Sequence, residues 1–131
     1  MTRRIEDRAK SHLLNEFKHP NYFFEDPGPG KGFDLWIVGT GGARQKAELK
    51  AHSGAFRRPS NLFERLIFNT DGERKLFEKG DTVIVRVFLG KPIRVFVVTN
   101  KILGLGAQLT SEARYVLRGK IDYNNTYTEL T

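Results

Sequence analysis

Two runs of Val, Ile and Phe joined by a short turn constrain the fold of this chain most. Residues 82–89 and 93–98 flank Gly90-Lys91-Pro92, an arrangement that predicts a β-hairpin. Because both runs are largely apolar, we expect these strands to lie in the centre of a sheet. The fold is therefore built around a β-sheet that contains this hairpin.

Helical and extended patterns alternate over the rest of the chain. Ile5, Ala9, Leu13 and Phe17 recur at helical spacing until Pro20 ends the pattern. In the same way we expect helices over residues 5–17, 62–68, 71–77 and 109–117, and strands over 22–24, 33–38, 46–51 and 121–127. The chain has 131 residues, of which 39% are hydrophobic, and it contains no repeat or long linker. We therefore predict a single mixed α/β domain over residues 1–131.

The chain contains no cysteine, which excludes disulfide bonds, thiolate nucleophiles, cysteine-based zinc sites and iron–sulfur clusters. No apolar run is long enough to cross a bilayer, and the first residues lack the apolar stretch of a signal peptide. We therefore expect a cytoplasmic protein without a membrane partner.

Basic residues outnumber acidic residues in this chain. Lys and Arg number 22 against 15 Asp and Glu, which gives a formal charge of +7 and an isoelectric point near 9.9. A field of this sign attracts polyanions, so nucleic acid is the leading expected partner. The alternative is that the charge serves only to keep the protein soluble.

Two glycine-rich segments resemble nucleotide-binding loops but lack residues that such loops need. Gly32 follows Lys31, where a phosphate-binding loop needs Ser or Thr to hold magnesium. Arg44 stands where a dinucleotide fingerprint beginning at Gly39 needs its third glycine. The sequence therefore disfavours a nucleotide site in either segment.

A carboxylate in an apolar strand and a second strand of alternating charges form the most informative pattern. Asp34 lies in the run 33–38, and Glu48 and Lys50 share one face of the next strand by the two-residue period. A turn near Gly41-Gly42 would place Asp34 opposite Lys50, and Trp36 opposite Glu48. Two carboxylates suit Mg²⁺, and a neighbouring lysine can orient or activate a water.

The first helix adds a third carboxylate to this pattern. Glu6 falls in the middle of the apolar arc of that helix, so its side chain is expected to point inward. A buried carboxylate needs a partner, and Lys50 or the metal patch is the natural one. Glu16, nearer the edge of the arc, is the second choice.

Together these residues resemble the PD-(D/E)xK nuclease superfamily. The resemblance covers about residues 5 to 98, where Asp34 and thirteen intervening residues precede Glu48-Leu49-Lys50 and a helix bearing Glu6 comes first. The stretch from Gly32-Phe33-Asp34 to Ala47-Glu48-Leu49-Lys50, with Asp71-Gly72-Glu73, is most similar to the C-terminal domain of NO VEIN-type proteins. The small size and basic charge also resemble Holliday-junction resolvases. Phe33 replaces the proline that often precedes the aspartate.

The resemblance implies a restriction-endonuclease-like fold, in which helices flank a mixed β-sheet. It also implies that Asp34, Glu48 and the carbonyl of Leu49 bind Mg²⁺, with Mn²⁺ as a substitute. Lys50 would position the attacking water, and Glu6 would support the site. The expected function is a metal-dependent endonuclease that hydrolyses phosphodiester bonds in DNA, of a restriction, repair or junction-resolving type.

Basic residues near the Glu48 strand are the candidates for phosphate contacts. They are Lys46, His52, Arg57, Arg58 and Arg65, with Arg86 and Arg94 as weaker candidates. A non-catalytic nucleic-acid-binding module with the same fold is the alternative function, and a small interaction domain is a third. A homodimer is plausible for an enzyme that acts on two strands.

Overall fold

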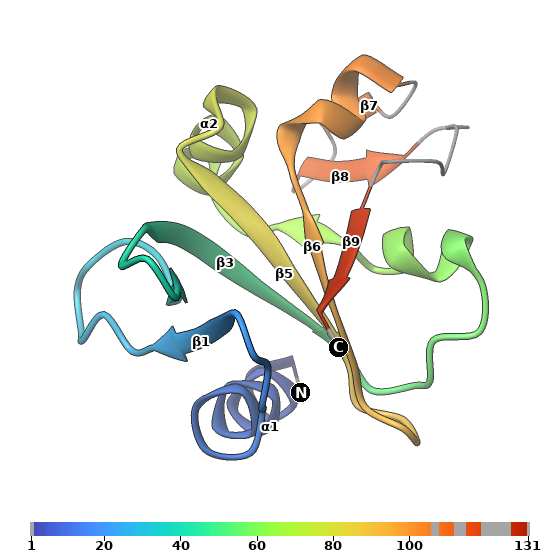
Figure 1. Ribbon diagram of the computed structural model, residues 1–131. Coiled ribbons are helices and arrows are strands. Elements are labelled where there is room, and N and C mark those ends of the chain that lie inside the picture. The colour runs from blue at the N-terminus through green and yellow to red at the C-terminus, as the bar shows by residue number, and fades with distance from the viewer. Residues whose placement is uncertain (1, 106–107, 112–114, 119–126, 131) are drawn as a thin grey trace.

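A computed structural model describes residues 2–105, 108–111, 115–118 and 127–130 of the chain (Figure 1). In chain order its elements are α1 (Thr2–Asn15), β1 (Tyr22–Glu25), β2 (Leu35–Gly39), β3 (Arg44–His52), the 3₁₀ helix η1 (Pro59–Phe63), β4 (Ile67–Phe68), α2 (Asp71–Lys79), β5 (Thr82–Phe88), β6 (Arg94–Val98), the 3₁₀ helix η2 (Asn100–Leu105), β7 (Gln108–Ser111), β8 (Tyr115–Arg118) and β9 (Tyr127–Leu130). The predicted mixed α/β architecture is confirmed.

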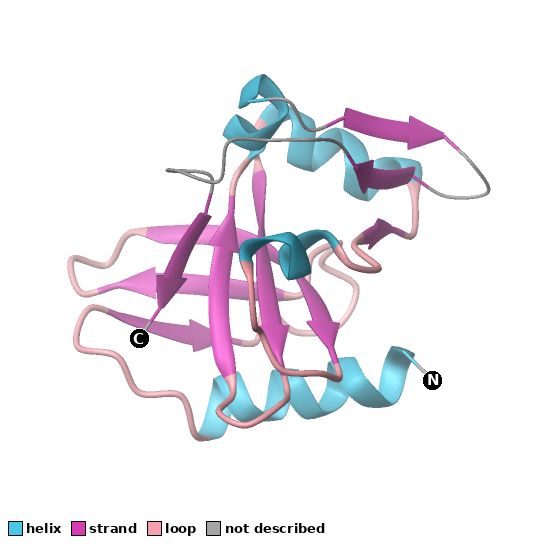
Figure 2. Cartoon of the chain, turned by 90° about the vertical axis from the view of Figure 1, so that its right-hand side faces the viewer, coloured by secondary structure: helices cyan, strands magenta, loops and turns pink. Residues whose placement is uncertain are grey.

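Six strands form one mixed sheet in the order β1-β2-β3-β5-β6-β9 (Figure 2). Strands β3 and β5 run parallel, and the other neighbours in this sheet are antiparallel. The parallel pair requires a crossover, which passes through η1, β4 and α2. The predicted hairpin of β5 and β6 is confirmed, and every side chain of β5 is buried.

The two α-helices cover opposite faces of the central strands (Figure 1). On one face Ala9 and Leu13 of α1 pack into a core with Val85 of β5. On the other face Phe77 of α2 packs with Ile84. Side chains alternate between the faces of a strand, so the even-numbered residues of β3 and β5 lie on the α2 side.

The pairing of β2 with β3 differs from the predicted register. Trp36 pairs with Lys46 rather than with Glu48, and the prediction was therefore wrong by two residues. The Gly39 N–H donates to the Ala43 carbonyl at 2.9 Å, which centres the turn on Gly41. Because the error is a multiple of the two-residue period, the predicted side chains still share one face.

The helix predicted over residues 62–68 was wrong. The chain instead forms η1, an irregular step and the short strand β4. Arg65 in that step has a φ of 55°, a left-handed conformation that no continuous helix contains. Asn61 stabilises the start of η1, because its Oδ1 accepts the N–H groups of Arg57 and Arg58 at 2.8 and 2.9 Å.

The helix predicted over residues 109–117 was also wrong, because its ends form strands β7 and β8. These strands pair antiparallel, and β8 also pairs with β4. Thr110, Tyr115 and Val116 favour extended backbone, and pairing with β4 satisfies backbone groups that a helix would satisfy internally.

At the end of the chain, Tyr127 lies in β9 at the edge of the large sheet, paired with β6. The rest of the extended tail predicted from residue 121 lies outside the described residues. Among the helices of the described segments, none combines the length and the apolar character that crossing a bilayer requires.

Candidate active site

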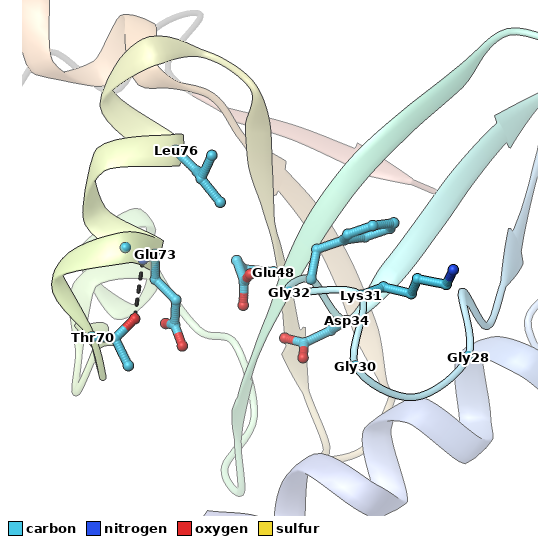
Figure 3. Close-up of a pocket in the computed structure, with 11 residues that line it drawn as sticks. Gly28, Gly30, Lys31, Gly32, Asp34, Glu48, Thr70, Glu73 and Leu76 are labelled. Atoms are coloured by element: carbon cyan, nitrogen blue, oxygen red, sulfur yellow. Dashed lines mark hydrogen bonds between the residues drawn. The ribbon is translucent and has the colours of Figure 1, made fainter.

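A cavity of about 540 Å³ opens between the 28–33 loop, strand β3 and the start of α2 (Figure 3). Asp34, Glu48 and Glu73 line it, and Figure 3 shows their carboxylates turned toward a common space. Two of these residues are the predicted metal ligands, and Glu73 was not predicted. The sequence therefore identified one wall of the cavity and missed the other.

Asp34 is held in place by the backbone of β3. Its Oδ2 accepts the Leu49 N–H at 2.8 Å, and its own N–H donates to the Ala47 carbonyl at 3.0 Å. In an extended strand the N–H and the C=O of one residue point to the same side, so the Leu49 carbonyl also faces the Asp34 side. Pairing with β2 has ended by this point, because its last pair is Leu35 with Ala47.

Glu48 is buried, with 3% of its surface exposed, and points from β3 into the cavity. Burial raises its pKa to about 9, and the negative charges of Asp34 and Glu73 and a hydrogen bond with Asp34 add to this effect. The positive charge of Lys50 acts in the opposite direction and does not compensate. Without a cation the Glu48 carboxyl therefore carries a proton at neutral pH.

The donor set at Asp34 and Glu48 fits a hard divalent cation. Their carboxylate oxygens and the Leu49 carbonyl are the ligand types that Mg²⁺ prefers, and such sites usually keep several water ligands. A cation between the carboxylates would take the place of the Glu48 proton and relieve the repulsion that raises its pKa. Within the described segments, no three His, Cys, Asp or Glu side chains converge to hold a metal by themselves.

Lys50 lies two residues beyond Glu48 on the same face of β3. Its side chain is 7% exposed, and its Nζ donates to Glu73 Oε1 at 2.9 Å. The ammonium also lies 5.8 Å from the centre of the Phe68 ring. Lys50 is therefore a buried cation whose position is fixed from the helix side of the cavity.

Glu73 reaches the site because of the way α2 begins. Thr70, the residue before the predicted helix, caps it by accepting the Glu73 N–H at 3.1 Å. The Glu73 carboxylate accepts the Asn69 N–H at 3.3 Å as well as the Lys50 ammonium. The Thr-x-x-Glu pattern at residues 70–73 is a typical capping signal. It is the feature of the sequence that could have indicated a role for Glu73.

Glu6 of α1 approaches the same lysine from another direction. It is partly buried and lines a smaller cavity of about 160 Å³ together with Lys50, Arg65 and Asn69. Burial raises the pKa of Glu6, and the nearby positive charge of Lys50 partly opposes this shift. Glu16, the second choice from the sequence, has a 71% exposed side chain and pairs with His12.

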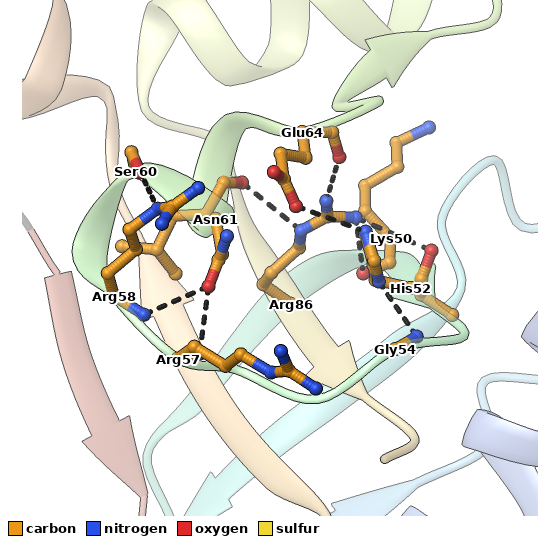
Figure 4. Close-up of polar contacts among 11 residues, drawn as sticks. Lys50, His52, Gly54, Arg57, Arg58, Ser60, Asn61, Glu64 and Arg86 are labelled. Atoms are coloured by element: carbon orange, nitrogen blue, oxygen red, sulfur yellow. Dashed lines mark hydrogen bonds and ion pairs between the residues drawn. The ribbon is translucent and has the colours of Figure 1, made fainter.

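The predicted phosphate contacts do not form one cluster. Lys46 is on the Glu48 face of β3 and 3.7 Å from Asp81, and Arg65 borders the Glu6 cavity. Arg57 and Arg58 are exposed on the loop after β3 (Figure 4). These residues therefore do not share a single site.

His52, another predicted phosphate contact, holds this loop through its two ring nitrogens. Its Nδ1 accepts the Gly54 N–H at 2.9 Å, and its Nε2 lies 3.4 Å from Glu64 (Figure 4). Burial, followed by the positive charge of Arg86, lowers the pKa of His52. The contact of His52 with phosphate stays a prediction, and in this structure both ring nitrogens are engaged within the loop.

The prediction that Arg86 contacts phosphate was wrong, because this residue is fully buried in β5. Its guanidinium donates to the carbonyls of Leu62, Lys50 and Ala51 at 3.1, 3.3 and 3.4 Å, and to that of Glu64 (Figure 4). It therefore fastens the crossover to β3 next to Lys50.

Arg94, the other weak candidate, is engaged elsewhere. It forms a two-pronged ion pair with Glu129 at 2.6 and 2.8 Å and stacks over Phe56. These contacts stabilise β6 against β9 and leave the guanidinium without a role at the cavity.

Comparisons with family models, with curated proteins and with solved structures find no match to this chain.

Proposed function

We propose that this protein is a metal-dependent endonuclease that hydrolyses phosphodiester bonds in DNA. The observation that carries the proposal is the geometry at β3. Asp34 and the buried Glu48 face one cavity, and the buried Lys50 follows on the same strand face. A buried carboxylate that other carboxylates repel destabilises a protein unless it binds something, and a divalent cation is the simplest ligand for such a group.

The arrangement of the elements supports the resemblance to PD-(D/E)xK nucleases. A first helix bearing Glu6 packs on one face of a mixed sheet, and α2 covers the other face. Strand β3 of this sheet carries Glu48 and Lys50, and Asp34 directly precedes β2. These are the parts expected of a restriction-endonuclease-like core, in the expected order along the chain.

In this mechanism Asp34, Glu48 and the Leu49 carbonyl would hold the metal. When bound, Mg²⁺ would polarise a phosphoryl oxygen and lower the pKa of a bound water. The Lys50 ammonium would orient the attacking water toward the phosphorus, because its positive charge acts on Glu48 and its side chain follows Glu48 on the same face of β3. Glu73 would hold Lys50 in position, and Glu6 would flank it from α1.

A nucleic-acid-binding module without catalytic activity is the second candidate, favoured by the net charge of +7. The buried Glu48 beside Asp34 counts against it, because these carboxylates repel phosphate and the burial of Glu48 costs stability in a protein that only binds DNA.

The test is cleavage of labelled single-stranded, duplex and branched DNA with Mg²⁺, with Mn²⁺ and with a chelator. Metal-dependent cutting is expected, and protein carrying Glu48→Gln, purified in the same way, controls for a contaminating nuclease. Equal cutting by both preparations, or binding without cutting under every metal condition, would reject the nuclease in favour of a contaminant or a binding module.

Glu73→Gln is expected to move metal binding to lower pH. The negative charge of Glu73 is one cause of the raised Glu48 pKa, so its removal allows Glu48 to ionise more readily. The measurement is the increase of the melting temperature on adding Mg²⁺, followed across pH. Glu78→Gln on the exposed side of α2 is the matched control, and an unshifted profile in Glu73→Gln would show that Glu73 does not act on the metal site.

A further inference from the structure

An aromatic strip with two cations lies beside the cavity on the same face of the sheet. It consists of Phe33 and Trp36 with Arg44 and Lys46. The two rings meet edge to face with centroids 4.8 Å apart. Arg44 lies 5.2 Å from the centre of the Trp36 ring, and Lys46 lies 5.6 Å from that of Phe33.

The strip is continuous with the candidate active site. Phe33 lines the cavity and directly precedes Asp34, and Lys46 is two residues before Glu48 on the same strand face. Trp36 pairs with Lys46 across β2 and β3, so its side chain lies on this face as well. A ligand that follows the strip from Trp36 to Phe33 therefore arrives at the two carboxylates.

The cations of the strip are accessible and only loosely held. Arg44 and Lys46 side chains are 48% and 40% exposed, and their partners Glu25 and Asp81 are 37% and 46% exposed. Ion pairs at such exposure contribute little stability and exchange readily for other anions. Cations beside aromatic rings are the combination that single-stranded nucleic acids bind, because bases stack on the rings while the cations contact phosphates.

We propose that this strip binds an unpaired DNA strand and leads it into the cavity. The inference deepens the proposed function and rests on it for the direction of the strand toward Asp34 and Glu48. Bases would stack on Trp36 and Phe33, and Arg44 and Lys46 would contact the adjoining phosphates. Bases in an intact duplex are already stacked on their neighbours, so the strip selects single-stranded DNA or DNA with an unpaired tail.

Trp36 is the only tryptophan of the chain, so its fluorescence reports on the strip directly. The experiment titrates the protein, in chelator and at fixed low salt, with an oligothymidine and with a hairpin duplex of equal charge. Quenching of Trp36 by the oligothymidine and not by the duplex is expected. Fluorescence anisotropy with labelled oligothymidine should show about ten- to a hundredfold weaker binding for Trp36→Ala.

Two variants separate stacking from damage to the fold. Trp36→Phe retains an aromatic face and should keep most of the affinity that Trp36→Ala loses. Tyr22→Ala removes a 41% exposed aromatic side chain, which lies on β1 opposite Gly39, and it should bind as the natural protein does. Binding that neither quenches Trp36 nor weakens in Trp36→Ala overturns the proposal.

The failure of this inference can be told apart from failure of the proposed function. If the protein cuts DNA with metal but the oligothymidine does not quench its Trp36 fluorescence, the proposed nuclease function stands and the proposed role of the strip is rejected. Quenching by the oligothymidine, with no cutting under any metal condition, would keep the strip as a binding surface and reject the nuclease.

Discussion

At pH 8 and without metal, protein carrying Glu48→Gln is expected to be more stable to unfolding than the natural protein, while its metal-dependent cleavage falls by about a hundred- to a thousandfold. The two effects have one cause. Glu48 is buried beside Asp34 and Glu73, where a third carboxylate is unfavourable unless a cation is bound. A neutral amide of the same shape removes that cost together with the metal ligand.

The pH dependence follows from the raised pKa of Glu48. In the folded protein this pKa is about 9, against 4.5 for an unperturbed glutamate, so between these values unfolding releases a proton. The metal-free protein therefore loses stability as pH rises through this window, by at most about 1.4 kcal/mol per pH unit. Below the window both states are protonated and the full stability is present. Glu48→Gln removes this contribution.

Urea unfolding at pH 5 and pH 8, with and without Mg²⁺, measures both consequences. In chelator the two proteins should differ more at pH 8 than at pH 5. Added Mg²⁺ should stabilise the natural protein at pH 8 and leave Glu48→Gln unchanged. Glu16→Gln, which alters a 71% exposed side chain, is the control. Equal stabilisation of Glu48→Gln by Mg²⁺ would exclude Glu48 as a ligand.

The sequence predicted the strand that carries the site because alternation along one strand is a local property. Glu48 and Lys50 share a face whatever their neighbours do, and so the face was predicted correctly although the register was not. The register depends on where the turn closes, and the chain closes it between Gly39 and Ala43.

Residues brought in from a distant element were harder to predict. Glu73 pairs with Lys50 across 23 positions of sequence, and only the folded crossover places it there. The Thr-x-x-Glu pattern at residues 70–73 indicates where a helix begins, but it does not indicate which strand that helix covers. For Arg86 the position in a strand was predicted but the role was not, because a basic residue in an apolar strand can contact a ligand or donate to buried backbone carbonyls.

Arg86→Met is expected to lower the free energy of unfolding by about 3–5 kcal/mol. Methionine fills a similar volume but supplies no donors, so the buried Leu62 carbonyl and the partly buried Glu64 carbonyl lose their partner. Those residues belong to the first part of the crossover, between β3 and β4. Loss of these hydrogen bonds therefore destabilises the segment that connects β3 to α2, the helix bearing Glu73.

Urea unfolding of Arg86→Met measures this effect, with Arg8→Met on the exposed side of α1 as the matched control. Arg86→Lys should recover only part of the stability, because one ammonium cannot reach carbonyls that the guanidinium contacts on both the crossover and β3. A loss below about 1 kcal/mol in Arg86→Met would show that water satisfies the carbonyls. The crossover would then be held to the sheet by its apolar residues, and the position of Lys50 would not depend on Arg86.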